Sequence, residues 1–391
     1  MRIVFYSLGV PSVLLGIIFI FKDAITPFFF TPTANDIAQN TEIIQEVEQN
    51  EIESEVNKNT SVSSTPEVIA SNLSVPWDVA FLPNGDLLIT ERTGSLVHID
   101  RSGVKTSIPV PDASSGGEGG LLGLALHPEF ASNNLLYLYM TTNSTDGLIN
   151  RVVRYAFENN SLKSPVTIID AIPGARYHDG GRIAFGPDGH LYITAGDAGV
   201  TAYAQDTSSL AGKILRLNDD GSVPSDNPFQ NEVYSYGHRN PQGLAWDNTG
   251  QLWSTEHGRS GAQSGFDELN KIEKGSNYGW PESQGDTVLD GTIAPVIHSG
   301  SDSTWAPASL AYNSGHFFWG GLRGEGIYIA EQTSAGASLL SPRFFREYGR
   351  IRTVLIGPDG YLYFTTSNTD GRGRPQNGDD KLYRIHPDAL L

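Results

Sequence analysis

A short motif recurs along most of this chain and limits the fold more than any other feature of the sequence. Its unit is Pro or Asp, then Asn or Asp, Gly, any residue and Leu, followed by residues that alternate as in a strand. Clear copies begin at Pro83, Pro187 and Pro358, and a variant begins at Asn248. Asx followed by Gly supplies the positive φ that a tight turn requires. Each copy therefore predicts a hairpin turn followed by an inner strand.

The spacing of these copies predicts six units. Of the three gaps between these four copies, two are about twice as long as the other. Weaker copies at 134–139 and 315–319 fall within the two long gaps. Units of roughly 50 residues leave room for later strands, which we expect at 94–99, 151–155, 213–217, 326–329 and 381–385. Four-stranded antiparallel units repeated six times describe a six-bladed β-propeller over residues 67–391. A β-sandwich is the main alternative, but sandwiches rarely keep so regular a long period.

Composition agrees with an all-β fold and excludes several functions. The 43 Gly and 22 Pro suit many tight turns. A net charge of −18 argues against binding nucleic acid, which needs a basic face. The absence of Cys excludes disulfides, thiolate metal sites, Cys nucleophiles and haem attached through a C-x-x-C-H motif.

The N-terminus predicts a membrane anchor. Residues 3–21 are apolar apart from two Ser and a few Gly or Pro, with Arg2 before them and Lys22 after them. At ~1.5 Å per residue this helix would span the ~30 Å hydrocarbon core. No small-residue cleavage site follows closely, so residues 1–22 favour an uncleaved signal anchor over a cleaved signal peptide. The excess positive charge before the apolar run predicts that the N-terminus lies in the cytoplasm and that the rest of the chain is extracytoplasmic. The protein would be membrane-anchored, or secreted if the segment is cleaved. An acidic linker over 23–66 would connect this segment to the propeller.

Two loops in the middle of the chain carry groups suited to proton transfer and anion binding. His178 lies in a Gly-rich loop before a strand, which suits a general base, and Asp197 could orient its ring. A surface histidine and a turn-capping aspartate are the alternative interpretations. The segment 237–244 holds His238, Arg239 and Asn240 together, a density of hydrogen-bond donors that a turn does not need.

Two later clusters indicate a cation and an anion site. A Gly loop at 256–259 is backed by carboxylates at 267–268 and followed by residues 277–280. Such oxygen donors suit calcium better than zinc. Arg323, Arg350 and Arg352 form a basic cluster in an acidic protein, and residues two apart in a strand share a face. We therefore expect a ligand with several carboxylates between these arginines, with exposed arginines beside acidic neighbours as the alternative.

Several motifs in order make the chain resemble a known family over about residues 67–391. They are the segments 75–78, 118–123, 127–130, 178–182, 237–243 and 277–281. Together they resemble the soluble quinoprotein glucose and aldose sugar dehydrogenases, the glucose/sorbosone dehydrogenase family. The resemblance implies a six-bladed propeller that uses pyrroloquinoline quinone (PQQ) and calcium to oxidise aldose sugars to lactones. Electrons would then pass to an external acceptor, which the sequence does not identify.

The resemblance also implies roles for individual residues around the quinone. His178 would take the proton from the anomeric hydroxyl while the C1 hydride passes to the quinone, and Asp197 would support His178. The cofactor would be held or polarised by residues from four loops: Glu118, Arg239, Asn240, Arg323, Arg350 and Arg352. Arg323 stands where glucose-oxidising members are expected to have lysine, which keeps the charge but changes the geometry.

Two calcium sites follow from the same resemblance. Gly258 and Arg259 would offer main-chain oxygens to the ion that also holds the quinone, although a proline is usual in place of Arg259. Glu268 and Tyr278 would belong to a further calcium site. The alternatives are a propeller that only binds glycans or a protein partner, and a calcium-dependent lactonase or other hydrolase. The sequence contains no unit of a strand, a Gly-rich turn and a helix, so it does not suggest a nicotinamide site.

Overall fold

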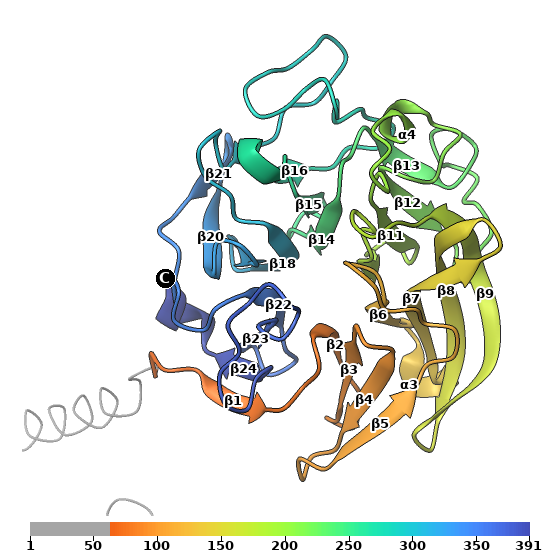
Figure 1. The fold of residues 1–391 in the computed structure, drawn as a ribbon, viewed down its shortest axis with the longest axis vertical. Coiled ribbons are helices and arrows are strands. Elements are labelled where there is room, and N and C mark those ends of the chain that lie inside the picture. Colours follow the sequence, from red (N-terminus) through yellow and green to blue (C-terminus); the bar gives the residue numbers. More distant parts are fainter. Residues whose placement is uncertain (1–62) are drawn as a thin grey trace, which may run out of the picture. The chain divides into compact units, whose positions relative to one another are not determined.

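The computed structural model describes residues 63–391 as six four-stranded antiparallel sheets arranged in a ring (Figure 1). The predicted membrane helix over 1–22 and most of the predicted linker over 23–66 lie outside the described residues. Within residues 63–391, no helix has the length and apolar character needed to cross a membrane. The prediction of a six-bladed propeller with four-stranded blades is confirmed.

Five of the six blades are built from four strands that follow one another in sequence. The first three blades are β2 (Pro76–Phe81), β3 (Leu87–Glu91), β4 (Ser95–Ile99) and β5 (Lys105–Pro109); β6 (Leu121–Leu126), β7 (Leu135–Ser144), β8 (Gly147–Glu158) and β9 (Ser161–Pro173); and β10 (Ile183–Phe185), β11 (Leu191–Ala195), β12 (Lys213–Leu217) and β13 (Val233–Tyr236). The next two are β14 (Pro241–Trp246), β15 (Leu252–Glu256), β16 (Glu268–Lys271) and β17 (Ile297–His298); and β18 (Pro307–Asn313), β19 (His316–Gly321), β20 (Gly326–Thr333) and β21 (Gly336–Leu339). The helical segments within residues 63–391 are short: α3 (Phe130–Asn133), α4 (Ala202–Gln205), η1 (Gly261–Gln263) and η2 (Pro387–Leu390).

The sixth blade joins the two ends of the described chain. It contains β22 (Ile351–Ile356), β23 (Leu362–Thr366) and β24 (Leu382–Ile385), and its outer strand is β1 (Glu67–Ala70). Glu67 lies opposite Arg384 in the β1–β24 register, and their side chains form an ion pair of 2.8 Å. The ring is therefore closed by pairing the first strand with the last.

The recurring turn lies one strand further out than the sequence pattern predicted. It precedes the second strand of each blade, for example β3 and β11, whereas the innermost strands are β2, β6, β10, β14, β18 and β22. Gly85 and Gly189 in these turns have φ of 88° and 79°, as the Asx-Gly argument requires. The prediction of an inner strand after the turn is wrong because the innermost strand is the first of each blade and the turn connects it to the second.

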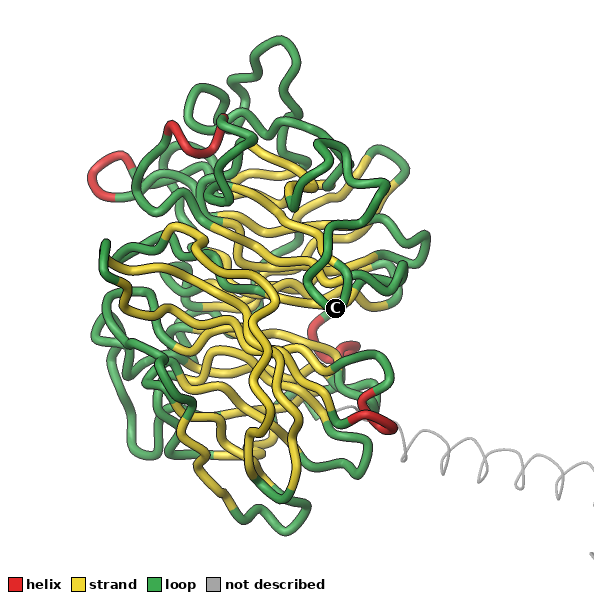
Figure 2. Tube along the Cα trace, turned by 90° about the vertical axis from the view of Figure 1, so that its right-hand side faces the viewer, coloured by secondary structure: helices red, strands yellow, loops and turns green. Residues whose placement is uncertain are grey.

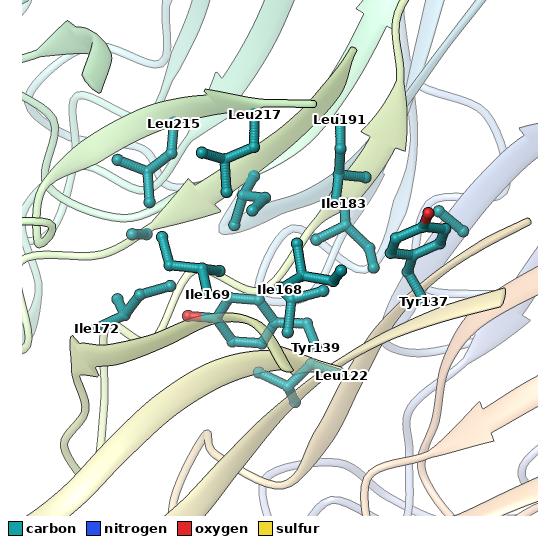
Figure 3. Packing of buried hydrophobic residues seen from close by; sticks show 14 of the residues in the cluster. Leu122, Tyr137, Tyr139, Ile168, Ile169, Ile172, Ile183, Leu191, Leu215 and Leu217 are labelled. Carbon is teal, nitrogen blue, oxygen red and sulfur yellow. The ribbon is translucent and has the colours of Figure 1, made fainter. Parts of the chain in front are cut away.

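Apolar side chains between neighbouring blades hold the ring together. Leu122 of β6, Tyr139 of β7 and Ile172 of β9 pack against Ile183 of β10 and Leu215 of β12, and all are buried (Figure 3). The strands run between the two faces of the ring, and loops gather on both faces (Figure 2). Because the blades bury each other's faces, the polar clusters of the sequence are left to the loops.

Candidate active site

A cavity of about 590 Å³ lies among loops of five blades. Strands one and two of a blade are antiparallel, so the loop before the first strand and the loop after the second open on the same face. Seven of the residues selected from the sequence line this cavity: Glu118, His178, Arg239, Gly258, Arg259, Arg323 and Arg350. Their loops are far apart in sequence, and the ring brings them together.

The imidazole of His178 is oriented by a chain of hydrogen bonds. Its Nδ1 lies 2.7 Å from Oδ1 of Asp197, and Oδ2 of Asp197 accepts a hydrogen bond of 2.9 Å from Nε1 of Trp280. Burial opposes ionisation of Asp197, but its bonds with His178, Gly199 and Trp280 outweigh this effect and lower its pKa. A carboxylate at Nδ1 favours the proton there and leaves Nε2 to accept one. Sequence reasoning did not give Trp280 this role.

The backbone of His178 is held in an uncommon conformation. Its φ is 64°, in the left-handed region that few residues other than glycine adopt. Oε2 of Glu118 accepts a hydrogen bond of 3.0 Å from the His178 N–H, and Oε1 of Glu118 pairs with Arg372 at 2.9 Å. Although burial opposes ionisation, His257, the His178 N–H and Arg372 lower the pKa of Glu118 to about 2. Glu118 is thus an anion that fixes the loop carrying His178.

Asn240 lies behind this loop, away from the cavity lining. It is fully buried, and its Oδ1 accepts a hydrogen bond of 3.0 Å from the Gly180 N–H. Its Nδ2 has no partner among residues 63–391. His238 is also buried, between Ser235 at 2.9 Å and Glu256 at 2.8 Å, where it joins strands. Of the three residues grouped by sequence in this segment, only Arg239 lines the cavity.

The cationic side chains of the cavity fall into two groups. Arg350 is paired with Asp370 at 2.8 Å, and Arg372 with Glu118. The other group comprises Arg239, Arg259 and Arg323, none of which has a carboxylate within 4.0 Å in the described part of the chain. Arg239 and Arg323 donate instead to neutral hydroxyls, those of Ser260 at 2.9 Å and Ser264 at 2.8 Å. The cavity therefore presents positive charge to a ligand.

The structure separates Arg350 from Arg352, which the sequence grouped on one face. Arg350 lines the cavity, whereas Arg352 lies outside the lining, with its guanidinium 5.7 Å from the centre of the Trp77 ring. Burial and the neighbouring Arg92 lower the pKa of Arg352 to about 9. Asp370, in the loop after β23, already compensates Arg350. The repulsion between Arg350 and Arg352, from which the sequence predicted a bound anion, is therefore relieved in part by Asp370.

The residues considered for calcium fall at two places. The N–H and carbonyl of Arg259 both bond to Gly265, at 2.8 and 3.2 Å, and the Gly258 N–H bonds to Asp267 at 2.8 Å. Glu268 and Tyr278 line a second, small cavity of about 10 Å³ together with Glu256 and Gln284, among others.

The small cavity contains a carboxyl and an amide oxygen that the protein leaves incompletely compensated. Burial and the nearby Glu256 raise the pKa of Glu268, and Oε1 of Gln284 is buried without a donor. A cation would stabilise both groups. The residues that the structure describes include no group of three or more His, Cys, Asp or Glu arranged to hold a metal ion. Calcium therefore stays a prediction.

Comparison with known proteins identifies the family of this fold and cavity. The sequence model of the Glucose / Sorbosone dehydrogenase family matches residues 73–384. The chain belongs to the glucose/sorbosone dehydrogenase family. The resemblance inferred from the sequence motifs is thus confirmed, and membership in this family places the chain among oxidoreductases.

Alignments with named proteins and with solved structures extend over much of the propeller. The aldose sugar dehydrogenase YliI of Escherichia coli is 36% identical in an alignment of 345 residues that covers 78% of this chain and 90% of that protein. The quinoprotein glucose dehydrogenase B of Acinetobacter calcoaceticus is 36% identical over 56% of this chain and 52% of its own length. The PQQ-bound aldose sugar dehydrogenase of Streptomyces coelicolor has a TM-score of 0.77 and 40% identity, covering 83% of this chain and 99% of that one.

Proposed function

We propose that this protein oxidises the C1 hydroxyl of aldose sugars to the lactone, with PQQ bound in the cavity and an external acceptor taking the electrons. One observation carries the proposal. The imidazole of His178, oriented by Asp197, faces the same cavity as three arginines that have no carboxylate partner within 4.0 Å in residues 63–391. A general base beside an anion-binding surface is what oxidation of a sugar by an acidic quinone requires.

The donor set of the cavity suits this cofactor. PQQ carries three carboxylates, and Arg239, Arg259 and Arg323 are three uncompensated guanidinium groups on the cavity wall. Nε of Arg259 and Nε2 of His257 are buried there without a hydrogen-bond partner in the described residues. The buried Nε–H of Arg259 is a donor without an acceptor, which is costly, and an anionic ligand would satisfy it. Arg239, Arg323 and Arg350 would hold the cofactor, with Asn240 and Arg352 supporting the wall behind it.

The residues of the chain have separate tasks in this reaction. When bound, the quinone supplies an acceptor for the hydride from C1 of the sugar. His178 takes the hydroxyl proton at Nε2, so the C1–O bond can become the carbonyl of the lactone. Asp197 stabilises the resulting imidazolium, and Arg239 supplies positive charge where negative charge develops. Glu118 keeps the backbone of His178 in position.

The experiment that tests this proposal uses the purified full-length chain. PQQ and calcium are added, and reduction of an electron-accepting dye is followed with a panel of aldoses. We expect turnover that requires the quinone, and we expect His178→Ala to lower kcat by at least about 100-fold without loss of quinone binding. His190→Ala, in the turn before β11, is the matched control and should leave kcat unchanged. Absence of both turnover and quinone binding would favour a propeller that only binds a ligand.

We also propose that calcium binds at the small cavity through Glu268, with Tyr278 and Gln284 beside it. The support is the half-buried carboxyl of Glu268 near buried Glu256, together with the buried Oε1 of Gln284, which has no partner in residues 63–391. The Arg259 carbonyl accepts one bond of 3.2 Å from Gly265 and keeps a second lone pair, so the Gly258–Arg259 loop stays the proposed site of the calcium ion beside the quinone. A rise in melting temperature on adding calcium, absent in Glu268→Gln, is the expected result. Equal calcium responses of the two proteins would contradict this site.

The membrane anchor is a further proposal, supported by the apolar run at 3–21 and the excess positive charge before it. It places the propeller outside the cytoplasm. A reporter enzyme that is active only outside the cytoplasm, fused after residue 391, should be active and sediment with membranes. An inactive reporter would contradict export.

A further inference from the structure

The side chain of Arg259 lines the large cavity, but the family resemblance assigns a role only to the main-chain oxygen of this residue. Arg259 lies in the loop between β15 and β16, where its N–H and carbonyl form two bonds with Gly265. Its guanidinium lies 4.6 Å from the centre of the Phe266 ring. These contacts fix both the backbone and the direction of the side chain, which lines the large cavity. The guanidinium is thus held in place for contact with a ligand.

The hydrogen-bonding capacity of this guanidinium is not met by the protein. Nε of Arg259 is buried and has no hydrogen-bond partner among residues 63–391, and no carboxylate lies within 4.0 Å of the side chain. The nearby carboxylate of Asp267 is already used, because it accepts from Gly258, Thr304, Trp305 and Ala306. A buried, charged donor without an acceptor is unfavourable in the free protein.

The neighbouring arginines show what makes Arg259 different. Arg239 and Arg323 each donate to a serine hydroxyl of the same loop, Ser260 and Ser264. No comparable bond of the Arg259 guanidinium occurs in the described part of the chain. Of the three uncompensated cations, Arg259 therefore gains most from a negatively charged ligand.

We propose that the guanidinium of Arg259 binds a carboxylate of the quinone cofactor. This inference rests on the proposed function. It assigns to the side chain a task separate from the main-chain oxygen that the resemblance gives to this position. Arginine offers two parallel N–H donors to a carboxylate, so the contact is strong and geometrically specific.

The test is calorimetric titration of PQQ into the metal-free full-length chain, without sugar, in chelator and again with calcium. Arg259→Gln removes the charge, and Arg259→Lys keeps the charge but loses the planar pair of donors. The matched control is Arg346→Gln, because Arg346 also stacks on a phenylalanine, Phe345 at 4.9 Å, outside the cavity lining. Melting temperatures verify that each variant is folded.

We expect Arg259→Gln to weaken quinone binding about 10-fold or more in both buffers, since loss of one charge-assisted contact is worth at least a factor of this size. Arg259→Lys should bind with intermediate affinity, and Arg346→Gln like the unmodified chain. Added salt should weaken binding more in the unmodified chain than in Arg259→Gln. Equal affinities of the unmodified chain and Arg259→Gln would overturn the inference while leaving the proposed function intact. Failure of the unmodified chain to bind the quinone would overturn both.

Discussion

At the scale of single residues, the backbone of the proposed base, His178, is held by the carboxylate of Glu118, a residue of another loop. His178 has a φ of 64°, and Glu118 accepts its N–H. A backbone in this region costs free energy and persists only where neighbours hold it. Glu118 is therefore a positioning residue, and its carboxylate oxygen is the feature that matters.

Replacement of Glu118 should separate this role from general packing. We expect Glu118→Ala to lower kcat about 10- to 100-fold with a smaller change in KM, because the imidazole loses its alignment. Glu118→Gln keeps an acceptor for the His178 N–H and should recover most of kcat. Steady-state kinetics with a good aldose measures both constants. Equal losses in the two variants would show that the charge, and not the hydrogen bond, is needed.

The lowered pKa of Glu118 predicts a pH dependence of stability. Its pKa is about 2 in the folded protein against 4.5 when free. The unfolded chain therefore binds more protons as the pH falls from about 4.5 toward 2, so the stabilising contribution of Glu118 is present above this window and lost within it. The free energy of unfolding should lose at most roughly 3 kcal/mol from this group.

Urea unfolding at a series of pH values checks this dependence. The difference between the unmodified chain and Glu118→Gln should shrink as the pH falls through the window. The exposed Glu282 provides the control, since Glu282→Gln should show no such trend. A constant difference across the window would remove Glu118 as the titrating group.

At the scale of elements, loops of neighbouring blades are joined by single carboxylates. Asp267, just before β16, accepts hydrogen bonds from Gly258 in the same blade and from residues 304–306 before β18. Both loops line the cavity. The shape of the cavity wall is therefore set by contacts between loops as well as by the strands.

Removal of Asp267 should loosen the cavity wall. We expect Asp267→Ala to lower the free energy of unfolding by about 3 kcal/mol or more, because several buried donors lose their acceptor. Quinone affinity should fall as well, since Gly258 and Arg259 lose their support. Denaturant unfolding and calorimetry measure the two effects. Asp286→Ala is the control, as the Asp286 side chain is 94% exposed, and a similar loss there would contradict the argument.

At the scale of the whole molecule, the closure of the ring depends on β1. This strand supplies the outer edge of the sixth blade, and without it β24 would expose an unpaired edge. A chain that begins at Ser71 should therefore melt several degrees below one that begins at Val62 and should aggregate more readily. Thermal unfolding and light scattering compare the two chains. Equal melting temperatures would show that three strands suffice for this blade.

The fold itself was accessible from local sequence signals. Asx-Gly turns and alternating strands act over a few residues, so their regular recurrence predicted six blades, and the structure confirms this number. The one error, the position of the turn within the blade, arose because a turn does not show which of its two strands lies innermost. The motif at 178–182 lies in the loop before β10, and residues 237–240 precede β14, which begins at Pro241.

The sequence by itself determined the propeller, the family and the group of residues from which a site could be built, because these depend on short-range patterns. The tertiary structure alone decided which charges are compensated. Asp370 neutralises Arg350, Trp280 completes the chain to His178, Arg352 lies away from the cavity lining, and the side chain of Arg259 faces the cavity without a partner in the described residues. Trp280 and His178 belong to different blades, and Arg350 and Asp370 to two loops of the sixth blade. The distances between such groups are set by the packing of strands and the closure of the ring, which no local pattern encodes.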